Sequence, residues 1–256
     1  MTIAVKRVSH RFQTLDVLTD VSFDVGDNEI FAIVGPSGCG KSTLLSIIGG
    51  LSKPTSGDVR VAGLSGDALN PITFVFQDFA LLPWRSVAGN VQLPLEHREL
   101  SRAQMQDIVA DALQRTGLTD FADLYPKQLS GGMRQRVGIA RALAVKPSIL
   151  LMDEPLSALD GQTREILMED LSGLLASTQL SALYVTHNLD EALRLADRIA
   201  VFSRRPGRLR EIISVPIPRS ERMTPEAGAE LQRLHQRLWS SIRDEAIDAE
   251  REVAHV

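Results

Sequence analysis

The 256-residue sequence predicts an α/β fold in which a β-rich core is interrupted by a helical segment. Three observations support this prediction. A glycine-rich P-loop pattern, G-x-x-x-x-G-K-[ST], spans Gly35 to Thr43 and follows the apolar run Ile30 to Val34. β-Forming segments surround that loop and return after residue 147, whereas residues 86–145 show mainly helical periodicity. No internal repeat or low-complexity segment is visible.

Composition limits the kinds of partner and the compartment. The formal net charge of -4 gives no basic excess that would favour nucleic acid, so we expect no nucleic-acid partner. The single cysteine, Cys39, excludes an intrachain disulfide and fits a reducing compartment. No apolar run approaches the roughly 20 residues that cross a bilayer, and the N-terminus lacks the layout of a signal peptide. We therefore expect a cytosolic chain that reaches a membrane only through a partner.

The N-terminal segments predict a patch of antiparallel β-structure. Strands are expected over Ile3 to Val8 and Val21 to Val25, and the turn Gly26 to Asn28 leads into the apolar run before the P-loop. Phe12 falls in the loop between the two strands. Its ring either stacks on an adenine base or packs in the core, and the residues alone leave both interpretations open.

The P-loop has the residue types that phosphate binding requires. Its glycines let the backbone turn tightly, so that successive amide N–H groups point at phosphate oxygens. Lys41 is expected to reach the β- and γ-phosphates and Ser42 to ligate magnesium, while the helix predicted after the loop adds unpaired N–H groups. Because Cys39 lies in this loop, we expect thiol reagents to inhibit and ATP to protect. The predicted phosphate site comprises Gly35, Pro36, Ser37, Gly38, Cys39, Gly40, Lys41, Ser42 and Thr43.

Two further strands and an apolar loop follow. Strands are predicted over Asp58 to Ala62 and Ile72 to Phe76, the second leading to Gln77. The loop Phe79 to Trp84 is apolar and flanked by polar residues. It is either a plug of the core or a surface patch for a partner, and the sequence alone favours the plug.

The middle of the chain is predicted to be helical. Ser101 and Gln104 match a capping box, and Gly117 marks a helix end. An apolar stripe at 3.6-residue spacing lies between them, at Met105, Ile108, Val109, Ala112 and Leu113. We expect residues 78–147 to form a helical subdomain inserted between two parts of the core, 1–77 and 148–215.

Polar residues follow two later strands of the predicted core. Ser148 to Met152 reads as a strand buried on both faces, and Asp153 and Glu154 follow it at the sheet edge where α/β folds bind ligands. The alternative is an ordinary acidic helix start. His187 follows the strand Ala182 to Thr186, which makes it a candidate phosphate contact, although a lone histidine is commonly a surface residue.

The remaining segments complete the expected order of elements. Helices are predicted over Arg164 to Leu175 and Asp190 to Ala196, and a strand over Ile199 to Phe202. The tail, residues 216–256, begins a helix near Thr224 and Pro225. Its apolar residues recur at helical spacing, at Leu231, Leu234, Leu238 and Ile242, which predicts one amphipathic helix.

The segment Leu129 to Arg136, L-S-G-G-M-R-Q-R, resembles the signature motif of the ATP-binding subunits of ABC transporters. The resemblance covers roughly Ile3 to Val215 and implies a P-loop NTPase (RecA-like) core with an antiparallel β patch and an inserted helical subdomain. It implies an ATPase with ATP and Mg²⁺ as cofactors. Other motifs of the family are matched by Phe12, Gln77, Asp160 and His187, as the adenine-stacking aromatic, the Q-loop glutamine, part of the D-loop and the switch histidine.

The resemblance also implies how these residues act. Two copies of the chain close head to tail on ATP, so that the signature residues act on the partner's nucleotide. Glu154 is implied as the general base, Asp153 as a magnesium ligand through water, and Gln77 as a sensor of the metal and the γ-phosphate. His187 would hydrogen-bond the γ-phosphate. The nucleotide contacts contributed in trans would be Ser130, Gly131 and Gly132.

Within the family, three segments look most like importers of nitrate, sulfonate or taurine: Leu81 to Trp84, Gly132 to Arg136 and Phe202 to Arg208. That resemblance implies a peripheral position on the cytoplasmic face of the inner membrane, with a membrane permease and an extracytoplasmic solute-binding protein as partners. The loop ending at Trp84 would then face the permease. Two alternatives stay open: a soluble ABC ATPase acting on ribosomes or DNA, and a small-molecule P-loop kinase, which has no use for the signature.

Overall fold

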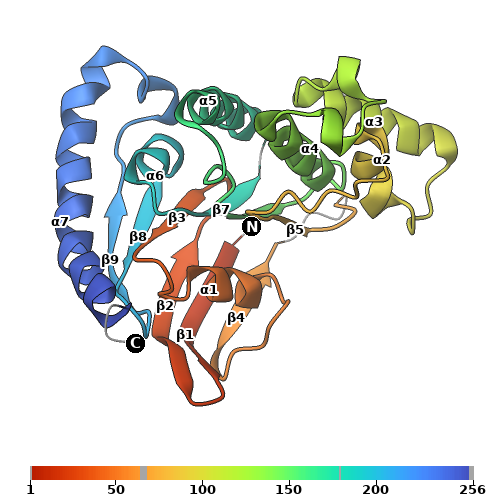
Figure 1. The fold of residues 1–256 in the computed structure, drawn as a ribbon. Coiled ribbons are helices and arrows are strands. Elements are labelled where there is room, and N and C mark those ends of the chain that lie inside the picture. Colours follow the sequence, from red (N-terminus) through yellow and green to blue (C-terminus); the bar gives the residue numbers. More distant parts are fainter. Residues whose placement is uncertain (1, 64–67, 179, 254–256) are drawn as a thin grey trace. The chain divides into compact units, whose positions relative to one another are not determined.

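The structure of the chain is a computed structural model that describes residues 2–63, 68–178 and 180–253. The chain forms two compact units (Figure 1): unit 1 comprises Met1–Gly63 and Ser181–Val256, and unit 2 comprises Leu64–Leu180. The expected helical subdomain, residues 78–147, and the expected domain boundaries at residues 77, 147 and 215 stay predictions.

Unit 1 contains the expected antiparallel patch as a three-stranded sheet in the order β2-β1-β4. Its strands are β1 (Thr2–Phe12), β2 (Leu15–Val25) and β4 (Ser56–Ala62). The first two strands are longer than predicted, because their pairing continues to Phe12 opposite Leu15 and the connection is a tight turn. Phe12 therefore ends a strand instead of lying in a loop.

The strand before the P-loop lies between two parallel neighbours in unit 1. The strand order is β7-β3-β8-β9, with β3 (Ile30–Val34) parallel to β7 (Ser181–Val185) and β8 (Arg198–Phe202). Every residue of β3 and of β7 is buried, as expected for strands covered on both faces. The edge strand β9 (Leu209–Ser214), antiparallel to β8, was absent from the sequence prediction.

The α-helices described in unit 1 are α1 (Lys41–Ile48), α6 (Leu189–Leu195) and α7 (Gly228–Val253). The predicted helix start at Thr224 forms a short 3₁₀ turn, η5 (Pro225–Ala227), before α7 begins. A similar turn, η4 (Arg219–Glu221), precedes it. The amphipathic stripe is confirmed, because three of its apolar residues are buried while Leu231 is partly buried: Leu234, Leu238 and Ile242.

A buried arginine holds the start of the tail against α6. The guanidinium of Arg222 donates to the carbonyl oxygens of Arg194 (3.2 Å) and Ala196 (2.7 Å), and so caps the carboxyl end of α6. Burial lowers the pKa of Arg222 to about 10, while Asp197 acts in the opposite direction. The tail is thus part of the packing of unit 1.

Unit 2 pairs two parallel strands, β5 (Ile72–Val75) and β6 (Ile149–Asp153), and contains most of the helices. Its core is a cluster of apolar side chains that includes Val91 of α2, Leu113 of α3 and Val137 of α4. The helical elements are α2 (Val87–Gln92), η1 (Leu93–Leu95), α3 (Arg102–Arg115), η2 (Thr119–Phe121), η3 (Pro126–Gln128), α4 (Gly131–Leu143) and α5 (Gly161–Ser177).

The predicted boundaries of α3 are confirmed in detail. The Ser101 hydroxyl accepts from the Gln104 N–H at 3.2 Å, and the Gln104 side-chain oxygen accepts from the Ser101 N–H at 2.8 Å. The capping box satisfies two N–H groups at the helix start. Gly117, with a φ of +66°, follows the last turn, and the intervening stripe faces the core of unit 2.

Candidate nucleotide site

The P-loop and His187 both lie at the carboxyl edge of the parallel sheet of unit 1. Ile33 pairs with Val185 in the parallel register, so β3 and β7 end side by side. The P-loop, residues 35–43, leaves the sheet directly after β3, and His187 follows β7 as an exposed side chain. This is the edge at which α/β sheets bind their ligands.

The P-loop curls around its own lysine. The buried Lys41 ammonium donates to the carbonyl oxygens of Gly35 (2.8 Å) and Pro36 (3.0 Å). Gly40, with a φ of +102°, is the N-cap of α1 and makes no side-chain cap bond. The first N–H groups of α1 therefore have no side-chain oxygen from the N-cap, and together with the ammonium they favour an anion at this point.

The underside of the P-loop rests on a segment that sequence reasoning did not place there. The Gly207 N–H donates to the Val17 carbonyl at 2.8 Å, and the Gly207 carbonyl accepts from Thr19 at 3.0 Å. A Cβ on Gly207 would lie 2.1 Å from the Cys39 carbonyl oxygen, so only glycine allows this approach. The Phe202 to Arg208 segment thus supports the loop. The only sequence signal was the glycine itself.

The Cys39 side chain does not face solvent. Its side chain is fully buried, and burial raises the pKa of its thiol, with Lys41 acting in the opposite direction. A thiol that is buried and protonated reacts slowly. The expectation of an accessible, ATP-protected thiol was therefore wrong, because the side chain at this position points into the packing of unit 1.

Phe12 is 54% exposed at the end of β1, with its ring edge-to-face against His10 at a centroid distance of 4.5 Å. This exposure excludes the core interpretation of Phe12. A flat ring held at a strand end is suited to stacking on a base, and that role stays a prediction.

In unit 2, Asp153 is the last residue of β6 and Glu154 follows it with a φ of +45°. A left-handed backbone is unusual for glutamate and stores strain of the kind that gathers at functional sites. The Glu154 carbonyl accepts from the N–H (3.2 Å) and hydroxyl (2.9 Å) of Ser157. The alternative of an acidic helix start is wrong, because the next helix, α5, begins only at Gly161.

The signature residues form the start of α4. The Ser130 hydroxyl accepts from the Met133 N–H at 3.2 Å and caps the helix, and Gly131 and Gly132 occupy its first turn. A Cβ on Gly132 would lie 2.7 Å from the Thr163 methyl carbon, so glycine allows close packing of α4 on α5. Sequence reasoning had not assigned this packing role.

Asp160 caps the neighbouring helix of unit 2. Its carboxylate accepts from the Thr163 N–H at 3.0 Å at the start of α5. The backbone hydrogen bond from Thr163 is the largest of the causes that lower the pKa of Asp160. A contact between Asp160 and nucleotide stays a prediction.

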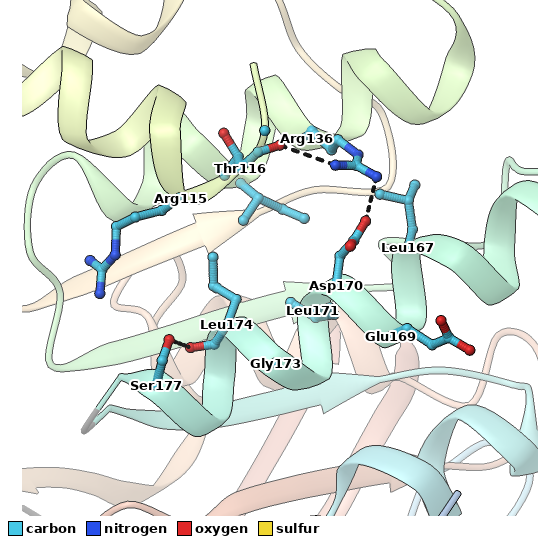
Figure 2. Close-up of a pocket in the computed structure, with 12 residues that line it drawn as sticks. Arg115, Thr116, Arg136, Leu167, Glu169, Asp170, Leu171, Gly173, Leu174 and Ser177 are labelled. Carbon is cyan, nitrogen blue, oxygen red and sulfur yellow. Dashed lines mark hydrogen bonds and ion pairs between the residues drawn. The ribbon is translucent and has the colours of Figure 1, made fainter. Parts of the chain in front are cut away.

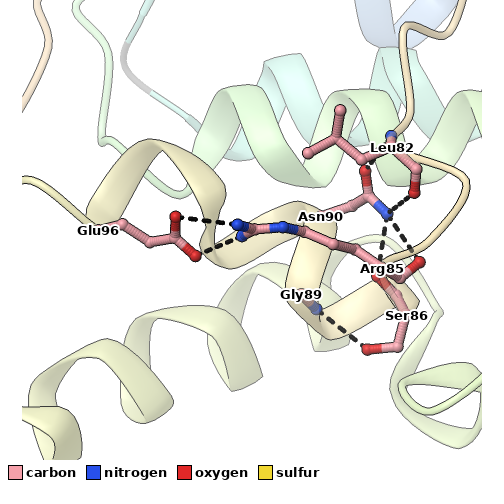
Figure 3. Close-up of polar contacts among 6 residues, drawn as sticks. All are labelled: Leu82, Arg85, Ser86, Gly89, Asn90 and Glu96. Carbon is pink, nitrogen blue, oxygen red and sulfur yellow. Dashed lines mark hydrogen bonds and ion pairs between the residues drawn. The ribbon is translucent and has the colours of Figure 1, made fainter.

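The apolar loop after β5 is partly a plug of the core and partly an exposed surface, the two interpretations that the sequence left open. Gln77 is exposed, and Leu81 packs on the core cluster of unit 2, whereas Trp84 is 71% exposed. The buried Asn90 side chain fixes this loop (Figure 3): its oxygen accepts from the Leu82 N–H at 2.7 Å. Its amide nitrogen donates to three carbonyl oxygens, those of Leu82, Arg85 and Ser86.

A pocket of about 460 Å³ lies in unit 2 between α5, α4 and the end of α3 (Figure 2). Leu167 and Leu174 line it together with Arg136, which donates to the Thr116 carbonyl at 3.2 Å and pairs with Asp170. The predicted nucleotide contacts do not line this pocket. It is therefore separate from the candidate nucleotide site.

The donor chemistry fits ATP and magnesium. A glycine-rich loop around an ammonium, followed by a helix start without a side-chain cap, matches a triphosphate. The candidate metal ligands are a hydroxyl, an amide and a carboxylate, all of them oxygen donors that Mg²⁺ prefers: Ser42, Gln77 and Asp153.

A buried parallel strand, a loop curled around a lysine and a helix that begins at that loop define a P-loop nucleotide-binding protein. Comparison with known families identifies which one. The family model described as ABC transporter matches residues 18–157. The chain belongs to the ABC transporter family and is an ATP-hydrolysing cassette of that family.

Similar proteins agree with this assignment. The nitrate import ATP-binding protein NrtD of Synechococcus elongatus is 39% identical, over 90% of this chain and 83% of the relative. The bicarbonate transport ATP-binding protein CmpD of Synechocystis is 42% identical, over 79% of this chain and 73% of the relative. A solved structure, a dimeric post-hydrolysis state of an ATP-binding cassette bound to ADP and Pi, has a TM-score of 0.72 and 34% identity. It covers 84% of this chain and is itself covered completely.

The similarity confirms the predicted fold class, the family and the ATPase activity. Among the residues that the structure describes, no helix is both long enough and apolar enough to cross a membrane.

Proposed function

We propose that the chain is the ATP-hydrolysing subunit of an ABC importer that drives uptake of a small solute such as nitrate, bicarbonate, sulfonate or taurine. The observation that carries this proposal is the P-loop held around Lys41 in a chain so similar to nitrate and bicarbonate transport subunits. Two copies of the chain would form a homodimer, which would bind a membrane permease at the cytoplasmic face of the membrane. An extracytoplasmic binding protein would deliver the solute.

The P-loop binds the triphosphate of ATP. Its amide N–H groups and the start of α1 donate to the phosphates, and Lys41 exchanges its loop carbonyls for phosphate oxygens. Phe12 holds the adenine by stacking. Magnesium bound by Ser42, by Gln77 and through water by Asp153 would neutralise charge on the phosphates.

Hydrolysis depends on groups placed around the γ-phosphate. Glu154 accepts the proton of the attacking water, and His187 donates to the γ-phosphate as charge develops there. The second copy of the chain completes the site with its signature helix, whose N–H groups and serine hydroxyl donate to the same phosphate. The contacts from that copy are Ser130, Gly131 and Gly132, with Asp160 beside them.

The proposal is tested on the assembled transporter. The tagged chain is purified in detergent from membranes of cells that express it natively. The complex is then reconstituted into liposomes, and ATP is supplied on the side of the membrane where the cassettes lie. We expect a multi-spanning permease to co-purify and labelled nitrate, bicarbonate, sulfonate or taurine to be taken up only with ATP. Lys41→Ala is the matched control, since it removes the phosphate ligand. Absence of a permease, or uptake that ignores ATP, would contradict the proposal.

A further inference from the structure

A buried carboxylate lies in α6, the helix that follows the candidate catalytic histidine. Glu191, in the first turn of α6, is 3% exposed, and its Oε2 atom accepts from the Tyr184 hydroxyl (2.8 Å) and the Thr186 hydroxyl (2.7 Å). A carboxylate in a first helical turn ordinarily complements the helix dipole at the surface. Burying it is costly unless hydrogen bonds compensate, and these hydroxyl groups provide such bonds.

Further hydrogen bonds hold the backbone on both sides of His187. On one side, the Thr186 N–H donates to the Ile33 carbonyl at 3.2 Å, which ties it to the P-loop strand. On the other side, the Asn188 N–H donates to the Thr186 hydroxyl oxygen at 3.0 Å. The Thr186 hydroxyl thus bonds both Glu191 and Asn188. Its bond to Asn188 spans His187, the residue between Thr186 and Asn188.

Asn188 closes the arrangement on α6. Its side-chain oxygen accepts from the N–H groups of Asp190 (2.9 Å) and Glu191 (3.3 Å), which caps the helix. The turn that carries His187 is therefore held by strand, helix and buried carboxylate together, while the imidazole itself is exposed. Such a turn presents a side chain to a ligand with little freedom of the backbone.

We propose that Glu191 is a positioning residue for ATP hydrolysis: through the hydroxyl groups of Thr186 and Tyr184 it sets the direction in which His187 meets the γ-phosphate. The inference rests on the proposed role of His187. Glu191 touches neither ATP nor water in this scheme, so it acts only through the histidine. Misplacing a catalytic group by about 1 Å lowers turnover as much as roughly 10²-fold, so the effect is measurable.

A double-mutant cycle on the full-length chain tests the inference. In Glu191→Gln the amide gives a weaker acceptor of the same shape, and we expect kcat for ATP to fall about tenfold with KM changed less than about twofold. In a His187→Ala background, adding Glu191→Gln should lower kcat less than about twofold relative to His187→Ala alone. Additive losses would mean that Glu191 only supports the fold, and would overturn the inference.

The cycle separates the inference from the proposed function. If His187→Ala hydrolyses ATP at the wild-type rate, the assigned role of His187 fails. If that variant is slow while Glu191→Gln is normal, the role stands and the inference fails. Tyr184→Phe, which removes one donor and keeps the ring, is the milder variant should Glu191→Gln not fold. It should lower kcat by a smaller factor with the same dependence on His187.

The NMR chemical shift of the His187 imidazole provides a readout that does not depend on the stability of the fold. The chain has five histidines, and the His187 signal is assigned by its loss in His187→Ala. Glu191→Gln should shift the His187 signal in the ATP-bound protein. Asp190→Asn is the matched control: Asp190 lies in the same helical turn and approaches His235 at 3.9 Å, so only the His235 signal should move. An unmoved His187 signal in Glu191→Gln would overturn the inference.

Discussion

Glu154 combines a carboxylate after a buried strand with a left-handed backbone, a φ of +45°. We expect Glu154→Gln to keep ATP affinity and to lower kcat by roughly 10²-fold or more, because an amide cannot take the proton of the attacking water. Phosphate release and equilibrium binding of ATP measure the two effects. Glu169→Gln, an exposed neutral control on α5, should hydrolyse normally. Near-normal turnover in Glu154→Gln would remove Glu154 from the role of base.

Cys39 gives a second test at the same scale, since it is the only thiol of the chain. Its burial and raised pKa predict that a disulfide reagent at pH 8 labels the native protein at least about 10²-fold more slowly than the unfolded protein. Reagent absorbance with and without urea measures both rates. Fast labelling of the folded chain would show that the P-loop opens readily.

At the scale of elements, the loop from Leu82 to Ser86 depends on one buried amide. Asn90→Leu keeps the size of the side chain but removes its four hydrogen bonds to the backbone of the loop, which costs about 1–3 kcal/mol of local stability. In a Trp239→Phe background Trp84 is the only tryptophan, and we expect its fluorescence anisotropy to decay faster.

Thr116→Val is the matched control for that experiment. It removes a buried hydroxyl at the end of α3, in the same unit, which donates to the Ala112 carbonyl at 2.9 Å. Its overall destabilisation should be similar while the anisotropy of Trp84 stays unchanged. Equal anisotropy in both variants would show that Asn90 does not order the loop.

The attachment of α7 depends on pH through Glu211 of β9. Its carboxylate accepts from Ser241 and, at 2.7 Å, from Arg237, and the bond from Ser241 is the main cause that lowers its pKa. A lowered folded pKa means stability that is present above the unfolded value of 4.5 and is lost as pH falls through the folded value. Glu211→Gln should therefore lower the melting temperature at pH 7 and flatten its fall below pH 5. An unchanged pH profile would exclude this anchor.

Local signals account for the elements that the sequence predicted well. The capping box at Ser101 and the stripe of α3 depend on residues within one turn of each other, so they can be read without tertiary structure. The strand β9 could not, since its pairing is set by β8. Nor could the contact between Gly207 and Cys39, which joins distant segments. The role of Glu191 could not be predicted either, because its bonds to Tyr184 and Thr186 form only in the fold.

At the scale of the whole molecule, ATP should join two copies of the chain. In Glu154→Gln, which is expected to bind ATP but hydrolyse it slowly, we expect Mg²⁺ and ATP to double the mass of 28.1 kDa measured by light scattering. Adding Ser130→Asp keeps a good helix cap but sets a negative charge against the partner's phosphates, so dimers should be lost while ATP binding remains. Dimers that persist in the double variant would exclude the signature as the trans contact.

The place of β3 between β7 and β8 has a consequence for synthesis. Residues 30–34 leave the ribosome long before residues 181–202, which form both neighbours of that strand. At about 5–20 residues per second, the P-loop strand waits roughly ten to thirty seconds for its sheet. The newborn chain therefore holds an apolar strand without its partners during most of translation. An apolar strand with unpaired edges is prone to aggregate during that interval.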